Sequence, residues 1–308
     1  MRPPGEGEVL VRGRFASICG SDLHALMIGV SLPPFPQKPG FPGHEAIGEV
    51  VESRHPGFRS GDRVLTVPAP PESYSFADYQ TLPGSFCLKL PSGGDPLHLL
   101  MAQQLGTVIY ALRQHPHDVT GKTVMVMGQG SAGMFFAFLL KRAGAARVIV
   151  SDLSEARLAL SPGMGADLAL RANGTNVRET VMELTGGEGV DYLVEAVGTR
   201  RSLLETVELV RPGAEMLLFG LPDSREPVPF NFHEFFRKRV RAVTTYGAQV
   251  EPGLVSFQAA VELIARGQID VSPLVSHILP IEEVERAMRL AHERTDNAIK
   301  VSLRLQET

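Results

Sequence analysis

Two short polar segments near the start of the chain carry side chains that could bind a metal ion. They are Cys19-Gly-Ser-Asp-Leu-His24 and Gly43-His-Glu45. A Cys19 thiolate and a His44 imidazole are good zinc ligands, and a carboxylate such as Asp22 can orient a ligating histidine. From spacing alone, a single cysteine is more often a small buried hydrophobe, and Asp22 could cap a helix. A metal site is therefore one hypothesis beside a purely structural one.

The first of these segments also offers a route for a proton. The Ser21 hydroxyl and the His24 imidazole could pass a proton from a bound alcohol to solvent. His24 could equally be an ordinary surface residue. The role of this pair depends on whether an alcohol binds beside Cys19.

A glycine-rich segment in the middle of the chain has the pattern of a dinucleotide-binding turn. Gly128-Gln-Gly-Ser-Ala-Gly133 follows an apolar strand pattern at 123–127 and opens an apolar helix pattern at 132–143. The glycines permit a tight turn and close approach of the backbone to a pyrophosphate, and the helix N-terminus attracts phosphate. A turn without a ligand is the alternative. The cofactor-binding residues that this motif predicts are Gly128, Gly130, Ser131, Ala132, Gly133 and Asp152.

The acidic residue after the next strand bears on the choice of cofactor. Asp152 lies 24 residues after Gly128, where a carboxylate would bind the adenosine ribose hydroxyls. It would repel a 2′-phosphate, which favours NAD over NADP. Arg157 is near enough in sequence to weaken this inference, although a lone arginine in a first helical turn is more often a solvated charge.

Strand and helix patterns place the two candidate sites in different regions. The first hundred residues show period-two strands broken by many prolines and glycines, which predicts a loop-rich β region. From Lys122 onward, strands alternate with helices, as in a parallel sheet built from β-α-β units. The strands are expected at 123–127, 147–150, 166–170, 192–197 and 215–219, and the helices between them at 132–143, 155–160, 177–184 and 202–209. Helices at 257–266 and 281–293 follow, and a last strand at 298–305 could rejoin the first region.

Composition excludes several classes of protein. The chain has 308 residues, a formal net charge of −4 and two cysteines. Nucleic-acid binding would call for a basic patch, and two cysteines cannot form a disulfide framework. No apolar run approaches the roughly 18–20 residues of a membrane span, and the N-terminus lacks the pattern of a signal peptide. A cytoplasmic protein with a small-molecule substrate is the expectation.

In these residues the chain resembles the zinc-containing medium-chain dehydrogenase/reductase superfamily, which includes alcohol, sorbitol and threonine dehydrogenases. The resemblance covers nearly the whole chain. It rests on the segments Gly7-Glu-Val-Leu-Val11, Cys19 to His24, Gly40-Phe-Pro-Gly-His-Glu45, Gly61-Asp-Arg-Val64, Gly128 to Gly133, Gly186-Gly-Glu-Gly-Val-Asp191 and Glu195-Ala-Val-Gly198. It implies an α/β fold with two domains. One is a GroES-like β-rich catalytic domain at 1–103 and 272–308, and the other is a Rossmann domain with a doubly wound parallel sheet at 104–271.

The resemblance also assigns roles to individual residues. Cys19 and His44 match two ligands of a catalytic zinc, and Glu45 matches an acid that can approach or join the metal. Gln103 falls at the third-ligand position. Ser21 and His24 match a proton relay, and Asp22 matches the carboxylate that orients the histidine. On the cofactor side, the matching residues are Thr107, Val197, Gly198, Phe219 and Gly220 around the nicotinamide and Lys300 at the pyrophosphate.

The chain departs from the family pattern in three places. A neutral amide at Gln103 is a weak zinc ligand where the family has a thiolate or a carboxylate. The chain is also shortened. It lacks the lobe that holds a structural zinc, since no cysteine lies between Val64 and Ser75, so Cys87 is expected to be structural. A leading segment is missing too, so the β domain is expected to lack its first strands or to have a more open cleft.

These observations predict an NAD-dependent, zinc-assisted dehydrogenase of an alcohol or polyol. A zinc-free reductase of the quinone or enoyl type and a catalytically idle NAD-binding protein are the alternatives, and Gln103 favours either. By analogy with the family, we expect a homodimer or homotetramer, in which the strand-like segment 239–246 could take part. The mixed aromatic and basic run 233–239 is expected to be a solvated helix face.

Overall fold

The structure is a computed structural model that describes residues 2–30, 32–68, 74–115, 117–173 and 176–306. Its contacts divide the chain into two compact units. Unit 1 comprises Met1–Tyr110 and Gly247–Thr308, and unit 2 comprises Ala111–Tyr246. The domain boundaries given above stay a prediction. Residues 69–73, in the segment where no structural-zinc lobe is expected, lie outside the described residues.

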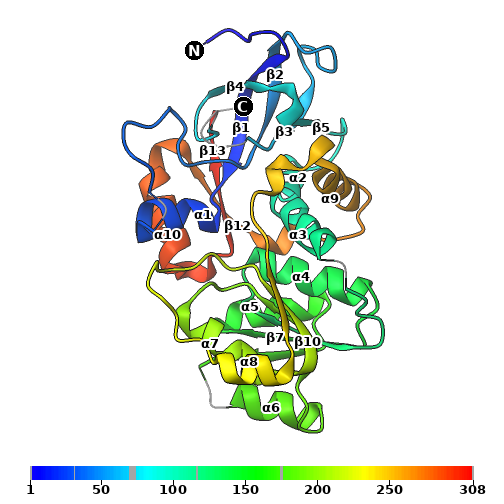
Figure 1. The fold of residues 1–308 in the computed structure, drawn as a ribbon. Coiled ribbons are helices and arrows are strands. Elements are labelled where there is room, and N and C mark those ends of the chain that lie inside the picture. The colour runs from blue at the N-terminus through cyan, green and yellow to red at the C-terminus, as the bar shows by residue number, and fades with distance from the viewer. Residues whose placement is uncertain (1, 31, 69–73, 116, 174–175, 307–308) are drawn as a thin grey trace. The chain divides into compact units, whose positions relative to one another are not determined.

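Unit 1 is built on a seven-stranded sheet in the order β12-β13-β1-β2-β3-β5, with β4 paired to β1. The strands are β1 (Glu8–Ser17), β2 (Ala46–Ser53), β3 (Arg63–Thr66), β4 (Tyr79–Pro83), β5 (Cys87–Lys89), β12 (Val275–Pro280) and β13 (Lys300–Arg304). Strand β13, red in Figure 1, runs antiparallel to β1, blue, with Ser17 opposite Ser302. The last strand therefore rejoins the first region, as its sequence predicts.

Five α-helices accompany this sheet among the described residues. They are α1 (Gly20–Leu23), which continues into a π-helical turn at His24–Ile28, α2 (Pro96–Leu100), α3 (Ala102–Gln114), α9 (Val255–Ala265) and α10 (Val284–Glu293). Helix α10 buries Ala287 and Met288 in a cluster with Leu303 of β13. Burial of this apolar face removes it from water and fixes the helix against the sheet. Helix α3 runs from unit 1 into unit 2.

Unit 2 contains a six-stranded parallel sheet in the order β11-β10-β9-β6-β7-β8. The strands are β6 (Thr123–Met127), β7 (Arg147–Asp152), β8 (Leu168–Arg171), β9 (Val190–Glu195), β10 (Val210–Leu218) and β11 (Arg241–Thr244). The chain runs outward from β6 to β8, returns to β9, and then runs outward to β11. This reversal is the topology of a doubly wound sheet, and the predicted fold class is confirmed.

The reversal places helices on both faces of the sheet (Figure 1). Since crossover connections are right-handed, α4 (Ser131–Arg142) and α5 (Glu155–Leu160) share one face. The other face carries α6 (Asn176–Leu184), α7 (Arg200–Leu209) and α8 (Phe232–Lys238). Successive strand residues point to opposite faces of the sheet. On the face that carries α7, Met125 and Leu193 pack with Val207 in one apolar core. Among the described residues, no helix is long and apolar enough to cross a lipid bilayer.

Candidate active site

Cys19 and His44 come together because of the pairing of two strands in unit 1. Strands β1 and β2 are antiparallel, with Ala16 opposite Ala46, so the end of one meets the start of the other. Cys19 follows β1 as the N-cap of α1, and His44 and Glu45 directly precede β2. The potential ligand atoms of Cys19, His44 and Glu45 all lie within 4.8 Å of one another. The structure thus gathers three of the four predicted metal residues.

Asp22 connects the two halves of this cluster. One carboxylate oxygen accepts the Cys19 backbone N–H at 2.8 Å, and the other lies 3.1 Å from His44 Nδ1. The Asp22 side chain is 1% exposed. Since a carboxylate accepts, His44 carries its proton on Nδ1 and leaves Nε2 on the side of Ser21, whose hydroxyl is 3.3 Å away. Burial lowers the pKa of His44, but the Asp22 and Cys19 groups outweigh it and hold this pKa well above its ordinary value.

Glu45 is part of a buried ion pair. One carboxylate oxygen lies 2.5 Å from Lys300 Nζ and also accepts the Ser17 hydroxyl. The other oxygen, Oε1, is buried and has no hydrogen-bond partner among the described residues. Burial raises the pKa of Glu45, but Lys300, His44 and Ser17 bring it below its ordinary value, so this carboxylate is charged. A charged, partly unsatisfied carboxylate beside a thiol and an imidazole is an oxygen donor available to a cation.

Two other predicted residues have different surroundings from those expected. Lys300, assigned above to the cofactor pyrophosphate, is 2% exposed and lies against Glu45, with Gln104 Oε1 3.5 Å from its Nζ. Its contact with a pyrophosphate stays a prediction. Gln103, at the third-ligand position, is 6% exposed, and its amide nitrogen donates to the His44 carbonyl at 3.5 Å. Thr107 lies one turn further along α3 and donates to the Gln103 carbonyl at 3.2 Å.

The donor set in unit 1 fits zinc. Ligand bonds of about 2.0–2.3 Å in a tetrahedral site place ligand atoms roughly 3–4 Å apart. The three donor atoms meet this with small movements, given their 4.8 Å limit. A cysteine sulfur, an imidazole oriented by a carboxylate, and a second carboxylate with one unsatisfied oxygen match in number and kind the protein ligands that a catalytic zinc site uses.

The predicted proton relay begins beside this cluster. Ser21 and His24 are three residues apart on one helical segment, so their side chains share a face, and both are half-buried. The structure brings Ser21 to His44. Transfer from Ser21 to His24 stays a prediction.

The predicted dinucleotide turn lies at the carboxyl end of β6 in unit 2. Gly128 adopts φ 89°, and Gly130 caps the N-terminus of α4, whose first residues are Ser131, Ala132 and Gly133. A Cβ at Gly133 would lie 1.8 Å from the Gly128 carbonyl oxygen, so only glycine fits there. Asp152, at the end of β7, accepts the Gln129 N–H at 2.6 Å. The turn therefore has the geometry that the motif predicts.

The prediction that Arg157 is a solvated charge is wrong. The residue is only 8% exposed, and its Nη1 lies 3.9 Å from the position of a Cβ on Gly130. The physical reason is that α5 begins just after β7, so its first turn lies beside the glycine turn rather than in solvent. The Arg157 guanidinium therefore lies beside the dinucleotide turn.

The ends of β9 and β10 lie close together at the same edge of the sheet. A Cβ at Gly198 would lie 1.9 Å from the Leu221 carbonyl oxygen, and one at Gly220 would lie 2.2 Å from the Gly198 nitrogen. Glu195, fully buried, accepts the Val197 and Gly198 N–H groups at 2.9 Å, and its carbonyl accepts the Phe219 N–H at 2.8 Å. Sequence reasoning missed this positioning role of Glu195. Its signal was a carboxylate at the end of an apolar strand.

Known protein families match both parts of the chain. The family model of the alcohol dehydrogenase GroES-like domain matches residues 5–92, and that of the zinc-binding dehydrogenase matches residues 132–266. L-threonine 3-dehydrogenase of Pyrococcus furiosus is 28% identical over 300 residues, which cover 89% of this chain and 84% of that protein. Human sorbitol dehydrogenase is 28% identical over 313 residues, covering 92% and 85%.

A solved structure has the same fold over nearly the whole chain. L-idonate 5-dehydrogenase of Escherichia coli is similar with a TM-score of 0.81 at 25% identity, covering 97% of this chain and 91% of that one. The chain belongs to the zinc-containing medium-chain dehydrogenase/reductase superfamily. It is an oxidoreductase of the alcohol dehydrogenase type.

Proposed function

We propose that this protein is an NAD-dependent dehydrogenase of a secondary alcohol or polyol, with a catalytic zinc held by Cys19, His44 and Glu45. The observation that carries the proposal is the gathering of these ligand atoms within 4.8 Å, with His44 oriented by Asp22. Gln103 then supports the cluster through the His44 carbonyl rather than as a strong ligand. The proposal keeps the predicted domains, 1–103 with 272–308 and 104–271.

Zinc at this site would supply a Lewis acid for the substrate oxygen and lower the pKa of the alcohol. The chain's own residues then perform the remaining tasks. Asp22 holds the His44 proton on Nδ1, and Lys300 and Ser17 hold Glu45 in its ionised form. Ser21 takes the alcohol proton and His24 passes it to solvent. A bound nicotinamide would supply C4 as the acceptor of a hydride from the carbinol carbon, or as its donor in the reverse reduction.

The cofactor proposal rests on the turn in unit 2. Gly128 and Gly133 permit the close packing of the turn, and the N-terminus of α4 after Gly130 favours a pyrophosphate through its backbone N–H groups and helix dipole. Asp152 keeps unused acceptor capacity for ribose hydroxyls beside its two backbone contacts, which favours NAD. Because Arg157 is buried nearby, the ratio of kcat/KM for NAD and NADP is the direct measurement. A higher value for NADP would contradict the choice of NAD.

The substrate class follows from the named relatives. They act on L-threonine, sorbitol and L-idonate, which are all small compounds with a secondary hydroxyl and further polar groups. We propose a substrate of the same kind.

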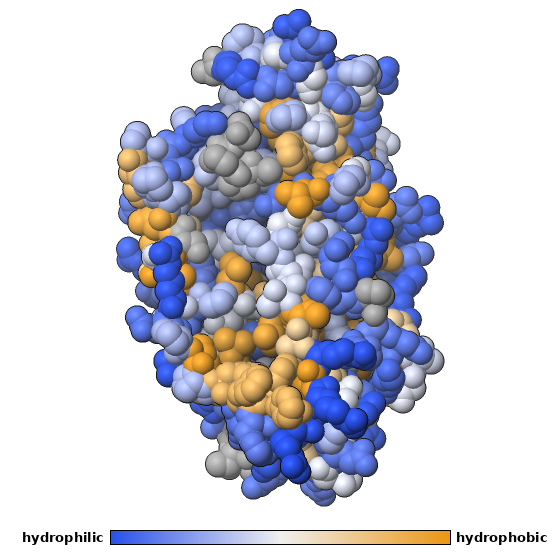
Figure 2. Space-filling view, in the orientation of Figure 1, coloured by the Kyte–Doolittle hydropathy of each residue, from blue (hydrophilic) through white to orange (hydrophobic). Residues whose placement is uncertain are grey.

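We also propose a homodimer, in which β11 meets its counterpart in a second copy. Strand β11 is the outer strand of the parallel sheet, and such edges pair readily. Next to it, α8 exposes Phe232 and Phe236 by 66% and 70%. Figure 2 shows apolar side chains gathered on the face that carries α8. Pairing of two such homodimers would give the predicted homotetramer. Unpaired Cys19 and Cys87 agree with a reducing compartment such as the cytoplasm.

The first experiment is zinc per chain, measured by elemental mass spectrometry on protein purified without chelator. We expect about one zinc per chain in the wild type, and none in Cys19→Ala. Cys87→Ala is the matched control, because Cys87 is buried in β5 and should leave the zinc content unchanged. A panel of polyols with NAD should then show turnover that Cys19→Ala loses while it retains NAD binding.

The zinc content, together with turnover and NAD binding, separates the alternatives. Turnover of quinones or enoyl compounds by zinc-free protein, unaffected by Cys19→Ala, would establish the zinc-free reductase. NAD binding without turnover of any alcohol, ketone, quinone or enoyl compound would establish an idle protein. Either result would contradict the zinc mechanism.

A further inference from the structure

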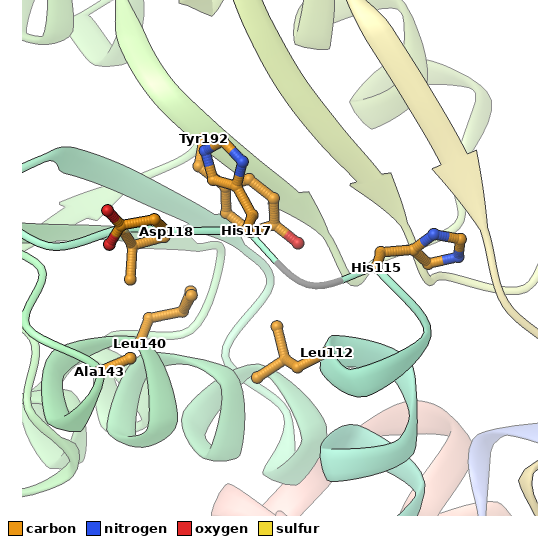
Figure 3. A pocket seen from close by; sticks show the side chains of 8 residues that line it. Leu112, His115, His117, Asp118, Leu140, Ala143 and Tyr192 are labelled. Atoms are coloured by element: carbon orange, nitrogen blue, oxygen red, sulfur yellow. The ribbon is translucent and has the colours of Figure 1, made fainter.

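Unit 2 contains a cavity at the end of its sheet opposite the dinucleotide turn. The cavity has a volume of about 380 Å³ and is lined by residues that include Leu112, His115, His117, Val119, Leu140 and Tyr192 (Figure 3). Tyr192 of β9 lies opposite Val124, the second residue of β6, whereas the glycine turn follows the last residue of that strand. Gly128 is four positions beyond Val124 along the strand, a rise of about 13 Å. The cavity is therefore not the predicted cofactor site.

Most polar side chains around this cavity already have partners within the protein. His117 Nδ1 lies 2.7 Å from a Glu215 carboxylate oxygen, and its Nε2 lies 3.3 Å from Lys122 Nζ. Glu215 is also paired with Arg241. Because the carboxylate accepts from Nδ1 and the ammonium donates to Nε2, His117 is a neutral imidazole, and burial correspondingly lowers the pKa of His117. Glu215 is thus held by His117 and Arg241, and the Asp118 carboxylate at the wall accepts the Thr120 N–H at 2.9 Å.

Tyr192 is the exception. It is 1% exposed and its ring stacks on His117, with centroids 5.0 Å apart. Its hydroxyl is buried and has no hydrogen-bond partner among the described residues. Figure 3 shows this hydroxyl directed toward the part of the cavity between Leu112 and His115. A buried hydroxyl without a partner costs free energy, and a ligand that accepts from it would remove that cost.

We propose that this cavity binds an uncharged, mainly apolar small molecule whose oxygen accepts a hydrogen bond from Tyr192. Leu112, Val119 and Leu140 supply the apolar wall, and the volume is at the lower end of small-molecule sites. The Asp118 carboxylate at the wall repels anions. The proposal is independent of the function proposed for the zinc cluster.

Ring-labelled tyrosine gives a direct readout by NMR, because the chain has only five tyrosines. The probes are benzamide, which carries an oxygen acceptor, and toluene, which has a similar ring without one. Both are titrated into the full chain without nicotinamide cofactor, so that binding does not depend on catalysis. We expect saturable shifts of the Tyr192 signal and binding of benzamide about fivefold or more tighter than binding of toluene. Absence of a saturable Tyr192 shift with either probe would overturn the proposal.

Three variants test the contact and the cavity. Tyr192→Phe removes only the hydroxyl, so it should abolish the preference for benzamide over toluene while toluene still binds. Tyr246→Phe is the matched control, since Tyr246 is 85% exposed, and it should keep the preference. Ala143→Trp adds a large side chain to the cavity wall and should weaken both probes. An unchanged preference in Tyr192→Phe, or unchanged binding in Ala143→Trp, would contradict the assignment. Because it removes an unsatisfied hydroxyl, Tyr192→Phe should unfold at the same or a higher temperature than the wild type.

Discussion

The metal cluster in unit 1 and the glycine turn in unit 2 are held in place by different kinds of interaction. In the cluster, side chains hold one another: Asp22 orients His44, and Lys300 pairs with Glu45. In the turn, two carboxylates hold the backbone, since Asp152 accepts the Gln129 N–H and Glu195 accepts the Gly198 N–H. Chemistry that needs particular donor atoms uses charged side chains. Recognition of a pyrophosphate uses the shape of the main chain, which most side chains would obstruct.

This difference predicts that the loss of one charged side chain damages the cluster, whereas a side chain added at a glycine damages the turn. Lys300→Met is the strongest case. Burial lowers the pKa of Lys300, but the Glu45 carboxylate outweighs it and keeps the ammonium charged. Removing the ammonium leaves Glu45 buried without its cation, which should cost about 3–5 kcal/mol in the free energy of unfolding. Urea denaturation of zinc-free protein measures it. Lys300→Arg should retain most of the stability, and the double variant with Glu45→Gln should recover part of the loss. A loss below about 1 kcal/mol in Lys300→Met would show that the pair is not needed.

Gly133→Ala tests the turn by adding a single methyl group. The new Cβ would lie 1.8 Å from the Gly128 carbonyl oxygen, so the backbone must shift. We expect a loss of about 1–3 kcal/mol in stability and a much weaker affinity for NAD, measured by fluorescence titration of NADH. Gly163→Ala is the control, since a Cβ there meets no atom within 4 Å. Unchanged NADH affinity in Gly133→Ala would break the comparison, because the turn would then tolerate volume.

Asp22→Asn changes one charge in the cluster and almost no volume. An amide can still accept the Cys19 N–H, but it holds the His44 ring less firmly than a carboxylate does. We expect zinc affinity to fall about 10- to 100-fold, while NADH affinity stays unchanged. Competition with a metal-binding dye measures the first, and fluorescence titration measures the second. An equal fall in both affinities would show that Asp22 acts on the whole fold rather than on the metal ligands.

The sequence predicts the turn better than the cluster, and the reason is physical. Strand, glycines, helix and acid follow one another locally, so the order of residues alone places Gly128, Gly133 and Asp152. The cluster depends on the pairing of β1 with β2 and of β1 with β13, contacts between distant parts of the chain. The residues of the cluster were therefore predicted from the resemblance to the family and not from their spacing. The ion pair between Lys300 and Glu45, and the hydrogen bond from Gln103 to the His44 carbonyl, appear only in the structure.

Element boundaries show the same contrast between local and tertiary causes. The strand at Thr123–Met127 matches its prediction at both ends, and the helix predicted to start at Glu155 begins at that residue. The helix predicted from Ile281 begins at Val284, because a 3₁₀ turn at Ile281–Glu283 follows Pro280. Strand β10 begins earlier than predicted because Val210 pairs with Val190 of β9. The register shifts between Val210 and Glu215, so the pattern of residues 211–214 does not indicate this pairing.

Asp167 shares features of both kinds of interaction and gives the smallest expected effect. Its carboxylate accepts a backbone N–H, from Val148 at 2.7 Å, and pairs with Lys141 Nζ at 2.8 Å. Burial raises the pKa of Asp167, but these two contacts outweigh it and hold the pKa below its ordinary value. The folded state therefore favours the charged form. Its contribution to stability is present above the pKa of an unfolded aspartate, about 3.9, and is lost as the pH falls through the lower folded-state value.

Asp167→Asn removes this titration while keeping the shape of the side chain. The variant should be slightly less stable than the wild type at pH 7, and the difference should shrink as the pH falls below about 4. Urea midpoints measured from pH 7 to pH 3 give the comparison, and repeating them in high salt separates the two contacts. Screening weakens the exposed Lys141 pair but not the hydrogen bond from Val148. A difference that disappears in salt would assign Asp167 to the kind of interaction that holds the metal cluster. One that persists would assign it to the kind that holds the turn.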